Sequence, residues 1–240
     1  RNTSRERFLE RYGGEPSPIA GRVLAPFSVL TNVREVEYEG GVSVEIAVDP
    51  GYSGAFVVEF VQVVGGQLRV LDEVYVQGLV AEEVIRECQR KSLWDKVTGG
   101  VADVAAKQHQ GMPAVWQVFA EQARTKAAPG GLRLRCQYVK AEPGIERLRS
   151  LIAVQVGGQE PRLVVHPRCR GFLAEAGVGP HPIGGMGVWR RQTDRAGNVV
   201  GPPEARNDHA SKALVYYAVN RFGYAARRPL VRRRMEFQVC

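Results

Sequence analysis

Three aspartates are the residues of this sequence best suited to chemistry. Asp49 closes an alternating apolar run, Asp103 follows a run of small apolar residues, and Asp208 opens a long amphipathic segment. Carboxylate oxygens are hard ligands that suit Mg²⁺ or Mn²⁺. Two such ions about 4 Å apart can activate a water molecule and stabilise the leaving oxygen of a phosphodiester. The three acids therefore indicate metal-dependent phosphodiester hydrolysis, provided that the fold brings them together.

Each aspartate also has an ordinary structural explanation. Asp49 precedes Pro50-Gly51 and could close an Asx turn. Asp103 could cap a helix that follows it, and Asp208 could complement a helix dipole from the first turn. Capping alone does not explain why acids stand at two strand ends and one helix start. We therefore interpret the three together as a catalytic and metal-binding set.

The elements that must position these acids begin with strands. Alternating apolar residues over 42–48 predict a strand that ends at Asp49, and the run 55–64 is apolar on both faces, as in a central strand. Gly65-Gly66 predicts a hairpin turn into the next strand. The further predicted strands span 67–76, 97–106, 132–139 and 162–167.

Other segments of the chain have apolar residues at helical spacing, which predicts helices. The predicted helices span 79–88, 113–126, 143–154 and 207–222. Asn207 is the expected N-cap of the last helix, and 185–206 predicts an exposed hairpin before it. This order predicts an α/β, ribonuclease-H-like fold: a mixed five-stranded sheet flanked by helices, with an added β-hairpin before the last helix. In that fold the first and fourth strands are neighbours, and the final helix crosses their ends.

The charge balance favours a polyanionic partner. The chain has 33 Lys and Arg against 25 Asp and Glu, a net charge of +8. Neutralising phosphates releases condensed counterions, although solubility alone is a simpler explanation. We expect Arg190, Arg191, Arg195 and Trp189 of the hairpin to contact DNA, while Trp189 is equally consistent with covering part of the core. Five more arginines crowd the C-terminus: Arg227, Arg228, Arg232, Arg233 and Arg234.

Several classes of protein are disfavoured. No apolar run approaches the roughly 20 residues that span a bilayer, so we expect no membrane partner. The four cysteines form no C-x-x-C pair, which argues against zinc. No G-x-x-x-x-G-K-[ST] loop is present, so we expect no P-loop ATPase motor in this piece. The charged start without an initiator Met favours a fragment of a longer chain.

The resemblance to a known family rests on three stretches. IAVDPGYSG (46–54), GVADVAAKQ (100–108) and PEARNDHASKALVYYAV (203–219), with the Trp-Arg hairpin before the last, resemble the C-terminal nuclease domain of the large terminase subunit of tailed phages. FLERYGGEPSPIAGRVLAPF (8–27) resembles the segment that joins the ATPase motor of that family to its nuclease. The likeness extends from Phe8 to Phe222. It implies three parts: a lead-in over 1–40 from a missing ATPase domain, the nuclease domain over 41–224, and a basic tail over 225–240.

The resemblance implies a function. The domain would cut double-stranded concatemeric viral DNA when genome packaging begins and ends, with little sequence preference. Asp49, Asp103 and Asp208 would hold Mg²⁺ or Mn²⁺, as two ions. The implied partners are double-stranded DNA, the ATPase domain of the same full-length chain, the portal protein and the small terminase subunit. The implied location is the host cytoplasm, transiently at the portal of the viral procapsid.

The sequence departs from the family at one position. Many members carry another acid four residues after the Asp-His-Ala aspartate, whereas this chain has Lys212. That puts a fourth ligand in doubt and leaves His209 as a helper candidate. Glu73 and Lys107 are further accessory candidates, for which a structural role and a solvated side chain are the simpler explanations.

Two other functions stay open at this point. A non-catalytic clamp for DNA or the portal could keep the same fold for docking. An actin-like or sugar-kinase-like ATPase shares the sheet topology and the Asp-Gly turn of residues 49–54. Such ATPases need a duplicated domain and a second phosphate-gripping hairpin, which this chain is too short to supply.

Overall fold

The computed structural model describes residues 21–107, 113–154 and 158–225. Among these residues, six strands form one mixed sheet in the order β5-β4-β1-β2-β3-β6. The strands are β1 (Val44–Asp49), β2 (Ala55–Val64), β3 (Gln67–Gln77), β4 (Val97–Ala102), β5 (Leu134–Cys136) and β6 (Leu163–Val165). The first three strands pair antiparallel, and β4, β5 and β6 each join the sheet in parallel.

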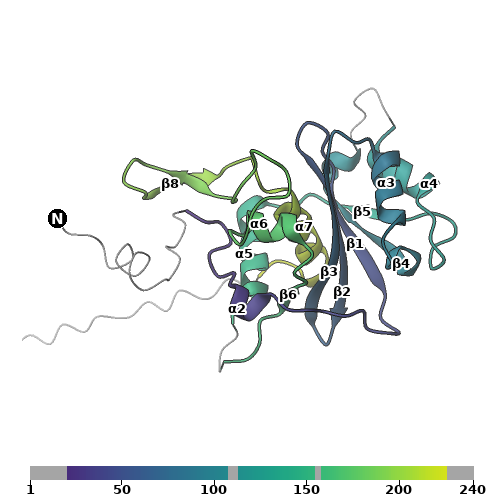
Figure 1. The fold of residues 1–240 in the computed structure, drawn as a ribbon, viewed down its shortest axis with the longest axis horizontal. Helices are drawn as coiled ribbons and strands as arrows, with labels where there is room; N and C mark the ends of the chain where they lie inside the picture. The colour runs from purple at the N-terminus through teal and green to yellow at the C-terminus, as the bar shows by residue number, and fades with distance from the viewer. Residues whose placement is uncertain (1–20, 108–112, 155–157, 226–240) are drawn as a thin grey trace, which may run out of the picture.

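Helices cover both faces of this sheet (Figure 1). They are α2 (Val29–Asn32), α3 (Ala81–Gln89), α4 (Val115–Gln122), α5 (Ala141–Ile152), α6 (Arg170–Glu175) and α7 (His209–Phe222), with 3₁₀ turns η2 (Trp94–Lys96) and η3 (Val104–Lys107). Helices α5, α6 and α7 bury one hydrophobic cluster against the sheet, and α3 and α4 bury another on the opposite face.

Strand β2 shows why the sequence dictates these layers. Val57 and Val61 pack into the cluster under α7, whereas Val58 and Phe60 pack into the cluster under α3 and α4. A strand covered on both faces must be apolar on both faces. The run 55–64 therefore forms a central strand, as its composition predicts.

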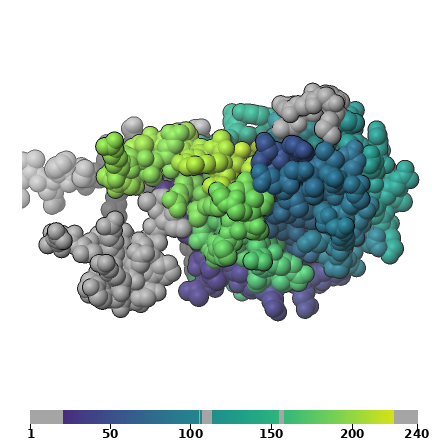
Figure 2. All heavy atoms as spheres, turned by 45° about the horizontal axis from the view of Figure 1, so that its top comes forward, coloured from purple at the N-terminus to yellow at the C-terminus, as the bar shows by residue number. Residues whose placement is uncertain are grey.

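The predicted α/β, ribonuclease-H-like fold is confirmed, with one correction to the sheet. It has six strands rather than five, because Leu163–Val165 pairs with residues 68–70 of β3 and extends that edge. The predicted hairpin is also present, as β7 (Arg191–Thr193) paired antiparallel with β8 (Val199–Pro203). It extends away from the main body and precedes α7 (Figures 1 and 2).

Part of the segment assigned to the lead-in belongs to the folded unit. Val23, Leu24 and Phe27 are at most 1% exposed and join the core on the α7 side. The buried Asn32 side chain donates to the carbonyl oxygens of Ile152 and Leu163. The folded unit therefore begins before residue 41. Residues 1–20 and the arginine-rich 226–240 lie outside the described residues.

A pair of acids lies inside this fold. Glu59 of β2 and Glu73 of β3 are direct cross-strand neighbours, exposed by 0% and 7%. Burial and the neighbouring Glu73 carboxylate raise the pKa of Glu59 well above its ordinary value. Burial therefore favours the neutral form of the Glu59 carboxyl in the folded chain.

We expect Glu59→Gln to weaken the pH dependence of stability. A carboxyl with a raised folded-state pKa contributes stability below its ordinary pKa of 4.5, and that contribution is lost as the pH rises through the folded value. Melting temperatures measured from pH 5 to 9 in EDTA should thus fall less in Glu59→Gln than in wild type. The exposed Glu121→Gln on α4 is the control. Parallel curves for wild type and Glu59→Gln would contradict the assignment.

Candidate metal centre

Strands β1 and β4 bring two of the predicted acids to one end of the sheet. The strands are parallel neighbours, with Val48 opposite Ala102, and the backbone N–H of Asp103 donates to the carbonyl oxygen of Val48 at 3.3 Å. Asp49 and Asp103 are the next residues after this pair. The two aspartates therefore lie next to each other at one end of the sheet, as the predicted topology requires.

The third acid enters from α7, which packs across β1, β2 and β4. Asp208 is the N-cap of this helix and is only 2% exposed. The expected cap, Asn207, is one residue too early. Its φ of 53° is a left-handed conformation that asparagine tolerates, and the helix begins after it.

One face of α7 provides a hydrogen-bonding partner for each aspartate. The pairs are His209 Nδ1 with Asp49 Oδ2 at 3.0 Å, Lys212 Nζ with Asp208 Oδ2 at 2.9 Å, and Tyr216 Oη with Asp103 Oδ2 at 2.8 Å. The partners are spaced by three and four residues, which places them on the same side of a helix. The structure thus brings all three predicted acids against one helix face.

Electrostatic interactions also link the three carboxylates. Burial lowers the pKa of Lys212, but the hydrogen bond to Asp208 and the charges of Asp208, Asp49 and Asp103 raise it above its ordinary value. Asp208 Oδ1 is buried without a hydrogen-bond partner among the described residues. Within those residues, no three His, Cys, Asp or Glu side chains are gathered as a ready-made metal cluster. Each aspartate instead faces its own partner on α7.

The environment of Asp49 strongly disfavours its ionised form. Burial raises its pKa to about 6, against the opposing effects of His209 and Lys212. Burial alone would lower the pKa of His209, but the hydrogen bond and charge of Asp49 raise it. Gly54 makes this contact feasible, because a Cβ there would lie 2.7 Å from His209 Cε1. The turn after β1 therefore needs glycine for the imidazole to reach Asp49.

A buried glutamate that the sequence analysis missed anchors this end of α7. Glu175 of α6 accepts hydrogen bonds from the backbone N–H groups of Ala210 and Ser211 at 3.0 and 2.8 Å, and from Tyr75 Oη at 2.8 Å. Burial raises the pKa of Glu175 to about 7, while these donors lower it. Glu175 thus satisfies orphan donors in the first turn of α7 and fixes the helix that carries Asp208.

Of the two remaining accessory candidates, only the Glu73 side chain lies within the described residues. Glu73 accepts hydrogen bonds from the backbone N–H groups of Gly171 and Phe172 at 2.7 and 2.8 Å, so it supports the start of α6. Lys107 lies in η3, and its side chain falls outside the described residues. The structural explanation for Glu73 is thus the one that its contacts support.

The hairpin presents some of its predicted DNA contacts at the surface. Arg190 and Arg195 are exposed, whereas Arg191 forms an ion pair with Glu142 at 2.7 Å. Trp189 is 3% exposed, packs in the core and donates its Nε1–H to the carbonyl oxygen of Glu204. The expectation that Trp189 grips DNA is therefore wrong, because its ring is buried at the base of the hairpin.

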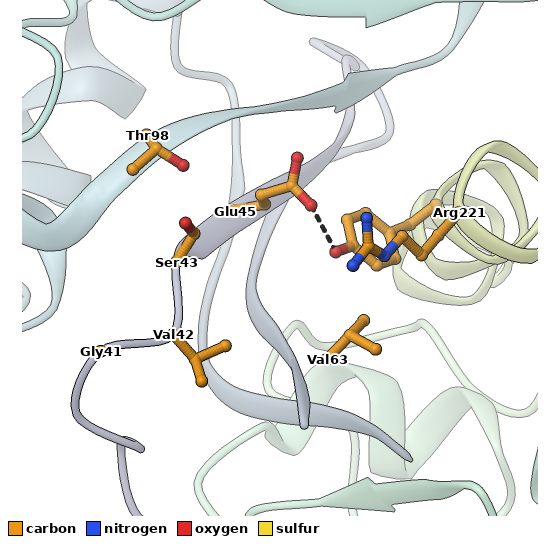
Figure 3. Close-up of a pocket in the computed structure, with 8 residues that line it drawn as sticks. Gly41, Val42, Ser43, Glu45, Val63, Thr98 and Arg221 are labelled. Carbon is orange, nitrogen blue, oxygen red and sulfur yellow. Dashed lines mark hydrogen bonds between the residues drawn. The ribbon is translucent and has the colours of Figure 1, made fainter. Parts of the chain in front are cut away.

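Two hollows lie near α7. One, of about 250 Å³, adjoins the acids and is lined by Asp208, Lys212 and Tyr216 together with the base of the hairpin. The other, of about 380 Å³, lies at the opposite end of β1, where Glu45 accepts a hydrogen bond from Tyr217 Oη at 2.7 Å (Figure 3). The second hollow is separate from the three aspartates, because Glu45 lies near the start of β1 and Asp49 is its last residue.

Solved structures resemble this fold. The nuclease domain of the P22 large terminase matches with a TM-score of 0.57 at 19% identity, covering 85% of this chain and 94% of that one. The g2p large terminase nuclease domain from bacteriophage SPP1, with bound Mn, matches with a TM-score of 0.51 at 13% identity, over 78% and 93%. The fold of this chain is thus that of large terminase nuclease domains.

A longer structure extends the comparison. The large terminase from the thermophilic bacteriophage D6E matches with a TM-score of 0.62 at 13% identity, covering 91% of this chain and 52% of that one. This chain therefore spans about half the length of that terminase. No protein-family model and no curated protein sequence matches it. Among the described residues, no helix is both long and apolar enough to cross a membrane.

Proposed function

We propose that this chain is a metal-dependent endonuclease domain that hydrolyses phosphodiester bonds of double-stranded DNA. The observation that carries the proposal is the convergence of Asp49, Asp103 and Asp208 on one face of α7. The fold likeness to terminase nuclease domains supports it, as does the Mn bound in the SPP1 structure.

The donor set fits a hard divalent cation. Asp49, Asp103 and Asp208 would hold it, since carboxylate oxygens are the ligands that Mg²⁺ and Mn²⁺ prefer. Asp208 Oδ1 is buried and unpartnered among the described residues, which is unfavourable for an ionised carboxylate unless a cation offsets it. When bound, such an ion would polarise the phosphate and lower the pKa of a water molecule.

The side chains of α7 act as positioning residues in this proposal. His209 holds Asp49, and Tyr216 holds Asp103, each through one carboxylate oxygen. Partners of this kind fix the rotamer of a metal-binding carboxylate. The exposed Arg190 and Arg195 of the hairpin would contact phosphates, which position DNA without reading its sequence.

In its biological setting, we propose that the domain cuts concatemeric viral DNA when packaging begins and ends. The ATPase domain of a longer chain, the portal protein and the small terminase subunit would be its partners, in the host cytoplasm and at the procapsid portal. The fold likeness to large terminases supports this setting. Arginines that contact phosphates would hold DNA without reading its bases, so we expect little sequence preference.

Plasmid cleavage tests the activity. The purified chain should nick and linearise supercoiled plasmid with Mg²⁺ or Mn²⁺, and EDTA should stop it. Asp103→Asn should remove cutting, while Asp95→Asn, the same change at a half-exposed acid in η2, should leave it intact. Salt-sensitive DNA binding without cutting under either metal would contradict the nuclease and support a non-catalytic clamp.

Metal affinity should depend on pH through Asp49. The raised pKa of about 6 means that Asp49 is protonated below that pH, and a proton must then leave before a cation binds. We expect Mn²⁺ affinity to be nearly constant above pH 7 and to fall by up to about tenfold per pH unit below pH 6. Calorimetric titration from pH 5 to 8 measures this, and a flat profile would argue against Asp49 as a ligand.

DNA binding should depend on the exposed hairpin arginines. Arg190→Ala and Arg195→Ala should each weaken binding to any duplex sequence and reduce the slope of log affinity against log salt concentration by about 1. Arg90→Ala, at the end of α3 on the opposite face of the sheet, is the matched control. Fluorescence anisotropy in EDTA, over a salt series, reports binding without cutting. An unchanged slope in both hairpin variants would exclude these contacts.

A further inference from the structure

Lys212 places a fixed positive charge among the three acids. Its Nζ donates to Asp208 Oδ2 at 2.9 Å, and its charge also interacts with Asp49 and Asp103. The Lys212 side chain is 37% exposed, whereas the carboxylate that its ammonium contacts is 2% exposed. A cation that belongs to the chain itself therefore already balances part of the negative charge of this cluster.

Side chains of α7 already engage part of the oxygens of these three carboxylates. On each acid, one oxygen is already engaged by an α7 side chain: His209, Lys212 or Tyr216. A carboxylate that bridges two neighbouring ions commonly gives one oxygen to each of them. On Asp208, one oxygen is bound to the ammonium, and only the buried Oδ1 is left for an ion.

The charges in the cluster also favour one divalent cation over two. Three carboxylates and one ammonium carry a net charge of −2, which one divalent cation neutralises. A second divalent cation would leave a net charge of +2 and would lie close to the ammonium, which repels it. With the charge of the scissile phosphate added, one ion leaves a net charge of −1 and two ions leave +1, and the second ion would still lie beside the ammonium that repels it.

We infer that Lys212 takes the place of one of the two metal ions, so that the three aspartates hold a single divalent cation. This inference rests on the proposed function, and it replaces the expectation of two ions. Lys212 would then stabilise negative charge on the phosphate as a fixed cation, in the part of the site where a second ion would otherwise lie. The chemical requirement is thus one Mg²⁺ or Mn²⁺ per chain.

Metal stoichiometry tests the inference without relying on activity. Mn²⁺ is titrated calorimetrically into the 240-residue chain, and electron paramagnetic resonance then reports whether bound ions are magnetically coupled to a neighbour. Wild type should bind one uncoupled Mn²⁺. Lys212→Glu, which removes the ammonium and adds an acid, should bind two coupled ions. Arg221→Glu, with the same charge change near the other end of α7, should still bind one.

The possible results separate the inference from the proposed function. Two coupled ions in wild type, both lost in Asp208→Asn, would overturn the role of Lys212 and leave the proposed nuclease standing. A folded Lys212→Glu chain that binds one ion would also overturn it. Wild type without any Mn²⁺ site that depends on Asp208 would overturn the inference and the proposed metal centre together. Because wild type alone distinguishes one ion from two, the test holds even if Lys212→Glu does not fold.

Discussion

Asp49→Asn is expected to abolish metal-dependent DNA cleavage while raising the thermal stability of the metal-free chain. Loss of a supporting partner lowers metal affinity or activity by about 10–100-fold, so loss of a ligand should lower cleavage by more than about 100-fold. Asparagine has nearly the shape of the neutral acid but cannot supply a charged oxygen. The variant therefore separates the ligand role of Asp49 from its contribution to folding.

The gain in stability follows from the direction of the pKa shift. Burial raises the pKa of Asp49 from its ordinary 3.8 to about 6, so ionised Asp49 opposes folding at neutral pH. That shift corresponds to about 3 kcal/mol of unfolding free energy. At pH 8 in EDTA the variant should melt higher than wild type, and the difference should shrink as the pH falls through about 6 toward 4.

Two assays on the same samples check this pair of effects. Plasmid cleavage with Mn²⁺ measures activity, and calorimetric melting in EDTA measures stability, with Asp95→Asn as the matched control for both. Retained cleavage would show that Asp49 is not a ligand. A lower melting temperature at pH 8 would show that the ionised form is better accommodated than its burial indicates.

Glu175→Ala is expected to give the largest loss of stability, about 3 kcal/mol or more. The change leaves two backbone N–H groups at the start of α7 and the Tyr75 hydroxyl without their acceptor. An unsatisfied buried polar group destabilises by about 1–3 kcal/mol, and the space left by the side chain adds to this. Since Asp208 caps the same helix, Mn²⁺ affinity should fall as well.

Urea unfolding at pH 8 in EDTA measures the stability change. Glu121→Ala on the exposed face of α4 is the control for loss of a glutamate side chain. Glu175→Gln should lose less than Glu175→Ala, because its amide oxygen can still accept one of the backbone hydrogen bonds. A destabilisation below about 1 kcal/mol in Glu175→Ala would mean that α7 does not depend on this anchor.

Much of the fold could be predicted because burial follows periodicity. The alternation before Asp49 and the two-faced apolar run of 55–64 can only be satisfied inside a sheet covered by helices. The sequence predicts a strand over 162–167, but a run this short does not show that it joins the sheet. Such a run could pack against many surfaces, and only its pairing with residues 68–70 decides its place.

Some residues of the candidate site could likewise be predicted from the sequence, and others could not. The three aspartates could be predicted because strand ends and a helix start are visible in the sequence, and topology then places them together. The spacing of 209, 212 and 216 was also available as a signal for one helix face. Glu175 was not, because a buried glutamate that caps another helix leaves no local pattern. Trp189 was misassigned because aromatic residues serve cores and nucleic-acid contacts alike.

The most direct test of this account is anomalous diffraction from crystals of the chain soaked in Mn²⁺. We predict one anomalous peak within bonding distance of carboxylate oxygens from Asp49, Asp103 and Asp208, with the Lys212 ammonium beside it. Two peaks there would keep the metal centre but remove the role given to Lys212. No peak among the three aspartates, at Mn²⁺ concentrations that support plasmid cleavage, would contradict the central claim that these acids form the metal site.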